Sequence, residues 1–453
     1  MMKQFLVVIV VVAMASSAFG GGILTNTNQS AQFIRTLSRN ASTAIDATYF
    51  NPAGLTKLDD GWHFAFHNQS VFQERTVTNG HPLLNNDEYV GKLNVPFFPN
   101  FYAVYKQEKF AVSFGFGPNA GGGSAEYESG LPSFEAGLAK IPAMVTQMGV
   151  PTSGYKADMY FKGQSVFYGI QLNASYAISD VFSAAIGGRY IMANNTYEGY
   201  IRDIQINPNY PAFGFTGNYM SAEQFFNALA SVNPAAGAYA AMVGDKKVDS
   251  KQTGTAITPI VSLNVKPIEA LNIGVKYEFK SPLELTNETE VDDTGEFPDG
   301  VKTQNDIPAI FALGADYAFA PQFRASLSFN YYFDKDVDWD GREELVDNNY
   351  IEIGVGAEYD LSEVFALSIG FLHSQPGVSE DYQNDISHSL NSNTVGLGFG
   401  YALTSALDFD FGILYGVYDE SVKTVADPEI GASFEETYNR TNFAFALGLG
   451  YHF

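Results

Sequence analysis

The chain lacks cysteine altogether and is poor in charge and in long apolar runs. Its 453 residues include no cysteine, so disulfides, thiolate metal sites and a lipid on an N-terminal cysteine are excluded. Charged residues make up only 17% of the chain, which is below the average of soluble domains. After residue 20 no segment has 18 consecutive apolar residues, so the sequence predicts no transmembrane helix.

Aromatic residues and glycine are abundant instead. The chain contains 37 Phe, 27 Tyr and 43 Gly, whereas Trp occurs only 2 times. A chain rich in aromatic residues and glycine, without long apolar runs, is typical of a β-barrel with an apolar outside. The formal net charge of −25 excludes nucleic acid as a partner, because nucleic-acid binding needs Lys and Arg on the phosphates.

The first twenty residues have the pattern of a secretory signal peptide. Lys3 supplies a positive charge, and residues 5–14 form an apolar core that is too short to span a bilayer. Ala18 and Gly20 place small residues three and one positions before a cleavage site. We therefore expect residues 1–20 to be removed and the rest of the chain to be exported.

From Gly61 onward, large apolar residues alternate with small or polar ones. The last strand shows this best, since Phe443, Phe445 and Leu447 share one face with Tyr451. Fourteen such segments predict an all-β fold, a 14-stranded antiparallel transmembrane β-barrel over residues 61–453. Short connections, including those near residues 106–109, 179–180 and 402–405, are the expected periplasmic turns. The long ones are the expected extracellular loops: 118–159, 201–251, 281–305, 334–349, 374–390 and 419–440.

Residues 21–60 are small and polar and show no strand alternation. They cannot form a core of their own, and a fourteen-strand barrel leaves a lumen that side chains alone do not fill. We therefore predict that this segment is an N-terminal plug, or hatch, inside the lumen. Its base is the hatch motif Asn51-Pro52-Ala53-Gly54-Leu55, where Pro fixes the backbone and Gly permits a turn. The alternative is an ordinary loop before a strand.

These features together resemble the FadL family of outer-membrane transporters for long-chain fatty acids and other hydrophobic compounds. The resemblance rests on the signal peptide, the motif Asn51-Pro52-Ala53, the fourteen strands and the terminal Phe453. It implies a passive channel in the outer membrane of a Gram-negative bacterium. Substrates would be fatty acids or aromatic hydrocarbons, captured by extracellular loops and released sideways through a kinked third strand.

Further partners are expected from this location. They are the outer-membrane lipid, lipopolysaccharide and, through Phe453, the machinery that assembles outer-membrane barrels. We expect the chain to be a monomer. A nonspecific porin or a structural or adhesive barrel is the alternative, although a porin would not need a plug.

The third predicted strand runs into a stretch rich in glycine and proline. Pro removes a ladder donor and Gly weakens strand pairing, so the stretch favours a kink that forms the lateral exit. The alternative is the start of a flexible loop. The residues concerned are Gly115, Gly117, Pro118, Asn119, Gly121, Gly122 and Gly123.

Two of the long loops contain helical patterns. Apolar residues recur at three- and four-residue steps within 131–150 and 221–243. Amphipathic helices there would form a capture surface for hydrophobic substrates, or would simply pack on each other and cap the barrel. The capture candidates are Phe134, Leu138, Ile141, Val145, Met148, Phe225, Phe226 and Leu229.

One acidic loop resembles a calcium loop. Asp336, Asp338 and Asp340 are followed by Asp347 in place of the usual terminal Glu, and the loop lies between strands. Calcium is therefore one hypothesis and a solvated acidic loop is the other. No other cofactor is expected.

Charged residues are also expected on the lumenal face. They hydrate or salt-bridge the wall, and one base among Arg189, Lys276 and Arg324 is a candidate partner for a substrate carboxylate. The acidic members are Glu278, Asp316, Glu352, Glu358, Asp408 and Asp410.

No catalytic motif is recognisable. A lipid hydrolase would need a serine with a histidine and an orienting partner. The pairs His388-Ser389 and His373-Ser374 are the only candidates. We expect the chain not to be an enzyme, with lipid hydrolysis as the less favoured alternative.

Overall fold

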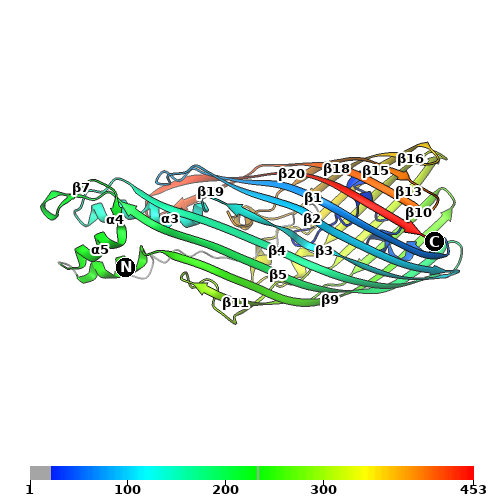
Figure 1. Ribbon diagram of the computed structural model, residues 1–453, viewed down its shortest axis with the longest axis horizontal. Coiled ribbons are helices and arrows are strands. Elements are labelled where there is room, and N and C mark those ends of the chain that lie inside the picture. The colour runs from blue at the N-terminus through cyan, green and yellow to red at the C-terminus, as the bar shows by residue number, and fades with distance from the viewer. Residues whose placement is uncertain (1–21, 232–233) are drawn as a thin grey trace.

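The computed structural model describes residues 22–231 and 234–453, so the predicted signal peptide lies outside the described residues. Fourteen antiparallel strands form a closed barrel, as predicted (Figure 1). The sheet closes because β20 pairs with β1 from His63↔His452 to Asn79↔Glu436. In order around the wall the strands are β1 Gly61–Asn79, β2 Glu88–Gln107, β3 Phe110–Tyr127, β4 Tyr155–Ala177, β5 Phe182–Ile206, β9 Lys246–Ile268, β10 Leu271–Glu278, β13 Ile310–Ala320, β14 Phe323–Tyr332, β15 Tyr350–Ser362, β16 Phe365–Gln375, β17 Ser392–Ala402, β18 Leu407–Tyr418 and β20 Ala432–His452.

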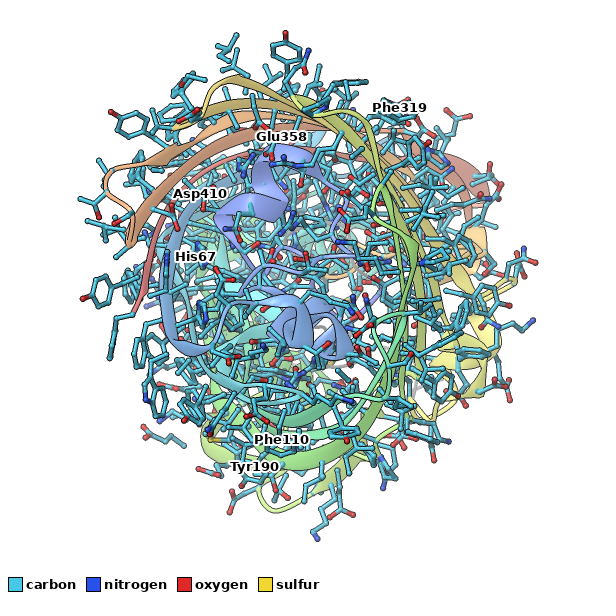
Figure 2. All side chains as sticks on the ribbon, turned by 90° about the vertical axis from the view of Figure 1, so that its right-hand side faces the viewer. His67, Phe110, Tyr190, Phe319, Glu358 and Asp410 are labelled. Atoms are coloured by element: carbon cyan, nitrogen blue, oxygen red, sulfur yellow. The ribbon has the colours of Figure 1, made fainter. Side chains whose placement is uncertain are left out.

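The alternation in the sequence sorts side chains to the two faces of the wall. Figure 2 shows Phe110, Tyr190 and Phe319 on the outside of the barrel and Glu358 and Asp410 on the inside. Phe319 is 63% exposed, whereas Glu358 is buried. An outer belt of exposed apolar residues around a polar interior is the arrangement of a membrane barrel.

One end of the barrel has short turns and the other has long extensions (Figure 1). The expected turns near residues 106–109, 179–180 and 402–405 are found where β2, β4 and β17 end. At the opposite end the expected loops 118–159 and 201–251 are found, but their predicted bounds are too wide. β3 continues to Tyr127 and β4 begins at Tyr155, whereas β5 continues to Ile206 and β9 begins at Lys246.

Short helices pack on these long strands and form an extension beyond the barrel. The extension has its own apolar core, which includes Phe134, Phe161, Tyr197 and Phe225. Each predicted helix is divided, because Pro142 and Pro234 lie at the starts of new helical segments. The segments are α3 Pro132–Ala139, α4 Ile141–Gln147, α5 Ala222–Ala230, η3 Pro234–Ala236 and α6 Gly237–Met242.

Residues 22–60 lie inside the barrel and are here called the lumenal segment. Figure 1 shows it as dark blue ribbon within the wall, toward the end with short turns. Its elements α1 Ala31–Thr36 and α2 Ala47–Phe50 are buried, as is most of the 3₁₀ helix η1 Pro52–Lys57. β1 begins directly after it, at Gly61.

The remaining elements are short pieces at the open end. They are β6 Asn209–Tyr210, β7 Phe215–Thr216, β8 Met220–Ser221, β11 Glu284–Asp292, β12 Lys302–Gln304, β19 Ser421–Asp427, η2 Pro211–Phe213, η4 Asp334–Asp336, η5 Arg342–Leu345 and η6 Glu380–Tyr382. Within the described part of the chain, none of the helices is both long and apolar enough to cross a membrane.

Candidate functional site

The pairing of β2 with β3 is interrupted in the middle of the wall. The two strands pair from Phe101↔Phe116 to Gln107↔Phe110, and again from Gly91↔Tyr127 to Leu93↔Ala125. Between these stretches, residues 94–100 and 117–124 form no pairs with each other in the described structure. β3 stays paired with β4 across the same region, with irregularities at Pro118/Ala120 and Gly121/Gly123. The wall therefore has an interruption on one side of β3 only.

Three prolines explain where the ladder stops. Pro96 and Pro99 on β2 and Pro118 on β3 all lie in the interruption. A proline has no N–H and cannot donate to a neighbouring strand. Pro118 was predicted from the sequence to lie at the kink, whereas Pro96 and Pro99 were not, although two prolines three residues apart in a strand are a readable signal.

Glycines let β3 bend within the interruption. Gly121 has φ +60° and Gly122 has φ +132°, a backbone region that glycine adopts readily. A Cβ on Gly122 would lie 2.2 Å from the ring of Phe98, which is buried against this stretch. Gly117 to Gly123 lie within the interruption, but Gly115 does not, because it still pairs with Tyr102.

The lumenal segment bonds to the carbonyl groups that β2 leaves unbonded. The backbone N–H of Asn26 donates to Asn119 O at 2.8 Å, and its side chain donates to Gly121 O at 2.6 Å. Gln29 donates to Pro118 O at 2.9 Å, and Thr25 forms an antiparallel bridge with Ala120. The segment therefore covers the interruption from the lumen.

The same residues also reach β2. Asn100 donates to Gln29 Oε1 at 2.9 Å, and Tyr102 donates to Gln29 O at 2.6 Å. Gln29 thus bridges both sides of the interruption. These contacts are polar and involve only a few residues. The lumenal segment therefore covers the interruption through defined hydrogen bonds and does not continue the sheet across it.

The hatch motif docks on β4 and β9, a few strands along the wall from the interruption. Asn51 is fully buried, donates to Asn264 Oδ1 at 2.7 Å and accepts from Ser262 Oγ at 3.1 Å. Ser175 Oγ donates to Pro52 O at 2.7 Å. Gly54 is required because a Cβ there would lie 2.4 Å from Ser42 O. Ala53 and Leu55 are buried beside them.

Helix α1 is anchored by an ion-pair group. Arg35 contacts Asp410 at 3.0 Å and also pairs with Glu358 and bonds to Ser368. Figure 2 shows Glu358 and Asp410 on the inner side of the wall, on either side of the lumenal helix. A guanidinium between two carboxylates offsets the cost of burying each charge.

The wall beside α1 carries glycines that admit its backbone. A Cβ on Gly370 would lie 2.2 Å from Thr36 O, and one on Gly396 would lie 2.4 Å from Ile34 O. No role was predicted for these glycines from the sequence, although glycine recurs at lumen-facing positions of several neighbouring strands.

The lumenal bases proposed as substrate partners are engaged by wall carboxylates. Arg189 and Lys276 both contact Glu278 at 2.6 Å, and Arg324 pairs with Glu358. Lys276 also donates to Tyr49 O at 2.8 Å and so holds helix α2. Of the acidic candidates, Glu352 accepts from Tyr332 at 2.7 Å. The structure thus favours the expected structural role for all three bases.

The lumenal segment contains a buried ion pair of its own. Arg39 donates to both oxygens of Asp46 at 2.8 Å, and Ser42 and Ser30 donate to the same carboxylate. Burial alone would raise the pKa of Asp46, but Arg39 and the two hydroxyls outweigh it and lower that pKa. The carboxylate fixes the turn between α1 and α2.

The capture candidates form part of the apolar core of the extension. Phe225, Phe226 and Val145 are fully buried, and Leu229 packs against them. Phe134, Leu138 and Ile141 are also buried, whereas Met148 is 40% exposed. Seven of the eight therefore pack as in the second alternative, and their role in capture stays a prediction.

The calcium candidates are not gathered into one site. Asp338 accepts from Asp340 N, Asp340 accepts from Gln304 N, and Asp347 O accepts from Lys335. Asp336 O accepts from Lys280. Among residues 22–231 and 234–453, no group of three or more His, Asp or Glu side chains is placed to hold a metal ion. A calcium site stays a prediction that this geometry does not support.

The hydrolase candidates have other partners. His373 pairs with Asn393 at 2.9 Å, and Ser374 donates to Glu352 at 3.2 Å. The ring of His388 packs on Tyr438, 5.3 Å between centroids. In the part of the chain that the structure describes, neither histidine is hydrogen-bonded to a serine hydroxyl.

Comparison with known proteins gives structural neighbours only. No protein-family model and no curated protein sequence matches the chain. A Pseudomonas aeruginosa FadL homologue has a similar structure, with a TM-score of 0.64, 13% identity and coverage of 96% of this chain and 99% of that chain. The P. putida toluene transporter TodX has a TM-score of 0.56 and 14% identity, with coverage of 91% of this chain and 95% of that chain. The Ralstonia pickettii toluene transporter TbuX has a TM-score of 0.54 and 15% identity, with coverage of 90% of this chain and 94% of that chain. The fold is that of FadL-type outer-membrane channels.

Proposed function

We propose that this chain is a passive channel that takes up hydrophobic molecules through the outer membrane of a Gram-negative bacterium. Molecules enter at the end that carries the extension and leave sideways through the interruption between β2 and β3. Long-chain fatty acids and aromatic hydrocarbons are the substrate classes proposed. The names of the structural neighbours, a FadL homologue and two toluene transporters, support this choice.

The observation that carries the proposal is the covered interruption in the wall. A break in the sheet that opens toward the apolar belt gives a hydrophobic molecule a route into the bilayer that bypasses the aqueous periplasm. Burial of each CH₂ group stabilises a molecule in hydrocarbon by about 0.8 kcal/mol, so lateral release is downhill. The lumenal segment holds the interruption closed, and its displacement would open the route.

A reversible disulfide tests this route. The chain has no cysteine, so Thr25→Cys with Ala120→Cys introduces the sole pair. The two residues are opposite each other in an antiparallel bridge, which is within the range that a disulfide spans. We expect the oxidised variant to lose uptake of labelled oleate and toluene in whole cells, and reduction to restore it.

A matched control is available in the extension. Thr253 and Thr286 are paired across β9 and β11, away from the interruption, so a disulfide there should leave uptake unchanged. Unchanged uptake in the oxidised 25–120 variant would contradict the proposed route. No uptake of either compound by the unmodified chain would contradict transport itself.

The proposal includes no catalysis and no nonspecific pore. The lumen is crossed by buried helices and ion pairs, which suits a plug better than an open porin. Deleting residues 22–60 should therefore raise ion conductance strongly. We further propose a monomer that contacts lipopolysaccharide and lipid, and whose terminal Phe453 is read by the barrel assembly machinery.

A further inference from the structure

The outer face of the wall carries a row of alternating charges just beyond the apolar belt. Five neighbouring strands, β1 to β5, each contribute one residue to it. Glu74 lies directly opposite Lys92, and Lys92 lies opposite Glu126. Glu126 in turn lies opposite Lys162, and Lys162 lies opposite Glu198. These five residues are here called the charged row.

The charged row points away from the lumen, at the level where lipid head groups begin. On β1 the last large apolar side chain of the outer face is Phe72, two positions before Glu74. On β4 the corresponding residue is Val166, four positions from Lys162. These steps are a rise of about 7–13 Å along a tilted strand, and head-group layers add about 5–8 Å to each side of the hydrocarbon core. The row therefore borders the belt on the side of the extension.

The charged row lies on the side of the barrel that holds the interruption. Figure 1 shows β1 to β5 side by side, running on toward the extension. The pair Lys92↔Glu126 is next to Leu93↔Ala125, where the interruption ends. On the other side, the described strands β13 to β18 contain no lysine. The row thus marks the outer end of the interruption.

The two lysines of the row are not engaged by the glutamates beside them. Opposite charges that face each other in a sheet attract, yet the side chains of Lys92 and Lys162 form no ion pair or hydrogen bond in the described part of the chain. By contrast, the exposed guanidinium of Arg202 contacts Asp158 at 2.8 Å. Both ammonium groups are therefore free to bind an external partner, while the glutamates between them reduce their mutual repulsion.

We propose that the charged row binds the phosphorylated sugar head group of lipopolysaccharide in the outer leaflet. Lysine ammonium groups are donors for phosphate oxygens. Carboxylates and phosphates share divalent cations, so Glu126, between the two lysines, would share the cations that bridge neighbouring head groups. Farther out, the rings of Tyr160 and Tyr200 stack with centroids 5.5 Å apart and extend the surface for contact with sugars.

The inference rests on the proposed function for the orientation of the chain, because that function places the extension outside the cell. It adds a fixed contact at the outer end of the interruption. Head groups held by Lys92 and Lys162 would lie above the lateral route, so a molecule that leaves the barrel would enter the hydrocarbon below them.

Binding of a matched glycolipid pair tests the inference. Lipopolysaccharide, and the same preparation after removal of its phosphates by phosphatase, can each be titrated by calorimetry into the purified full chain in detergent with magnesium. We expect the unmodified protein to bind the phosphorylated form about tenfold more tightly. Lys92→Gln with Lys162→Gln should remove this preference, while heat-modifiable migration shows an intact barrel. Chelation of magnesium should weaken binding of the phosphorylated form.

Lys109→Gln with Lys266→Gln is the matched control. It removes the same charge at the end with short turns, between β2 and β3 and near the end of β9, and should keep the preference. Equal affinity of the unmodified protein for the two forms would overturn the inference, and so would equal loss of preference in both double variants. Equally tight binding of phosphatidylglycerol would overturn the assignment to lipopolysaccharide, and binding that chelation leaves unchanged would overturn the role of Glu126.

The outcome is separate from that of the uptake experiment. A chain that takes up neither oleate nor toluene but prefers the phosphorylated glycolipid would contradict transport and leave the charged row as its binding surface. A chain that takes up either compound without that preference would contradict this inference alone.

Discussion

The lumenal segment and the extension are both built from short helices, but they are held in opposite ways. In the extension, Phe225 and Val145 lie in one continuous apolar core. In the lumenal segment, a small apolar cluster around Phe33 and Phe50 is surrounded by ion pairs and side-chain hydrogen bonds to the wall. The extension is thus held together by an apolar core, as a folded domain is, whereas the lumenal segment is held by polar contacts to the wall, as a bound ligand is.

The difference shows which region can move at low cost. Burial of apolar area is non-directional and is lost only when a whole core opens. A hydrogen bond between protein groups contributes about 0.5–1.5 kcal/mol, since water replaces it when it breaks. The lumenal segment can therefore be displaced piecewise within a rigid wall, whereas the extension opens as a unit.

The largest expected effect is on the extension. Phe225→Ala removes a fully buried ring and should destabilise the local fold by about 3–5 kcal/mol. Limited proteolysis of the purified protein should then cut within residues 207–245, while ion conductance stays unchanged. Met148→Ala is the control, because this side chain is 40% exposed and should change little. A rise in conductance with Phe225→Ala would show that the two regions are coupled.

A smaller effect is expected for the lumenal segment. Gly370→Ala places a Cβ 2.2 Å from Thr36 O and should displace α1 at a cost of about 1–3 kcal/mol. Ion conductance in planar bilayers should rise, while heat-modifiable migration shows an intact barrel. Gly188→Ala is the matched control, since the nearest atom to its Cβ would be 3.7 Å away. Equal conductance in both variants would mean that α1 does not depend on the glycine wall.

The smallest effect is expected from acid. Asp46 has a lowered pKa in the folded state, so its pairing with Arg39 contributes fully above the ordinary aspartate pKa of about 4. That contribution is lost as the pH falls through the lower folded-state value. Conductance should therefore stay constant from neutral pH to about 5 and rise only in stronger acid. Asp46→Asn should abolish this acid-dependent step, and a step between pH 5 and 7 would assign the response to another group.

The sequence predicts the wall of this protein well because lipid imposes a simple rule. Where the outside must be apolar and the lumen polar, apolar and polar residues alternate along every strand. All fourteen strands can therefore be predicted from the sequence. Beyond the apolar belt the alternation of β4 is inverted, because Lys156 and Lys162 face outward while Phe161 is buried in the apolar core of the extension. The strands continue there, and the sequence reads as loop.

The candidate site is only partly readable from sequence. Pro118 and Gly121 to Gly123 mark the bend in β3, because their backbone chemistry is local. The cover is not readable, because Gln29 and Asn26 meet β3 across some ninety positions of sequence.

The three prolines at the interruption keep it open as a permanent feature of the covalent chain. Pro96, Pro99 and Pro118 have no N–H, so β2 and β3 cannot form a continuous ladder of backbone hydrogen bonds along this stretch, even briefly. When Asn26 and Gln29 withdraw, the carbonyls of Pro118, Asn119 and Gly121 must find other donors, and water is the donor at hand. An open interruption is therefore hydrated, and under the proposed function a hydrocarbon that leaves the lumen would cross a thin layer of water before it reaches the acyl chains.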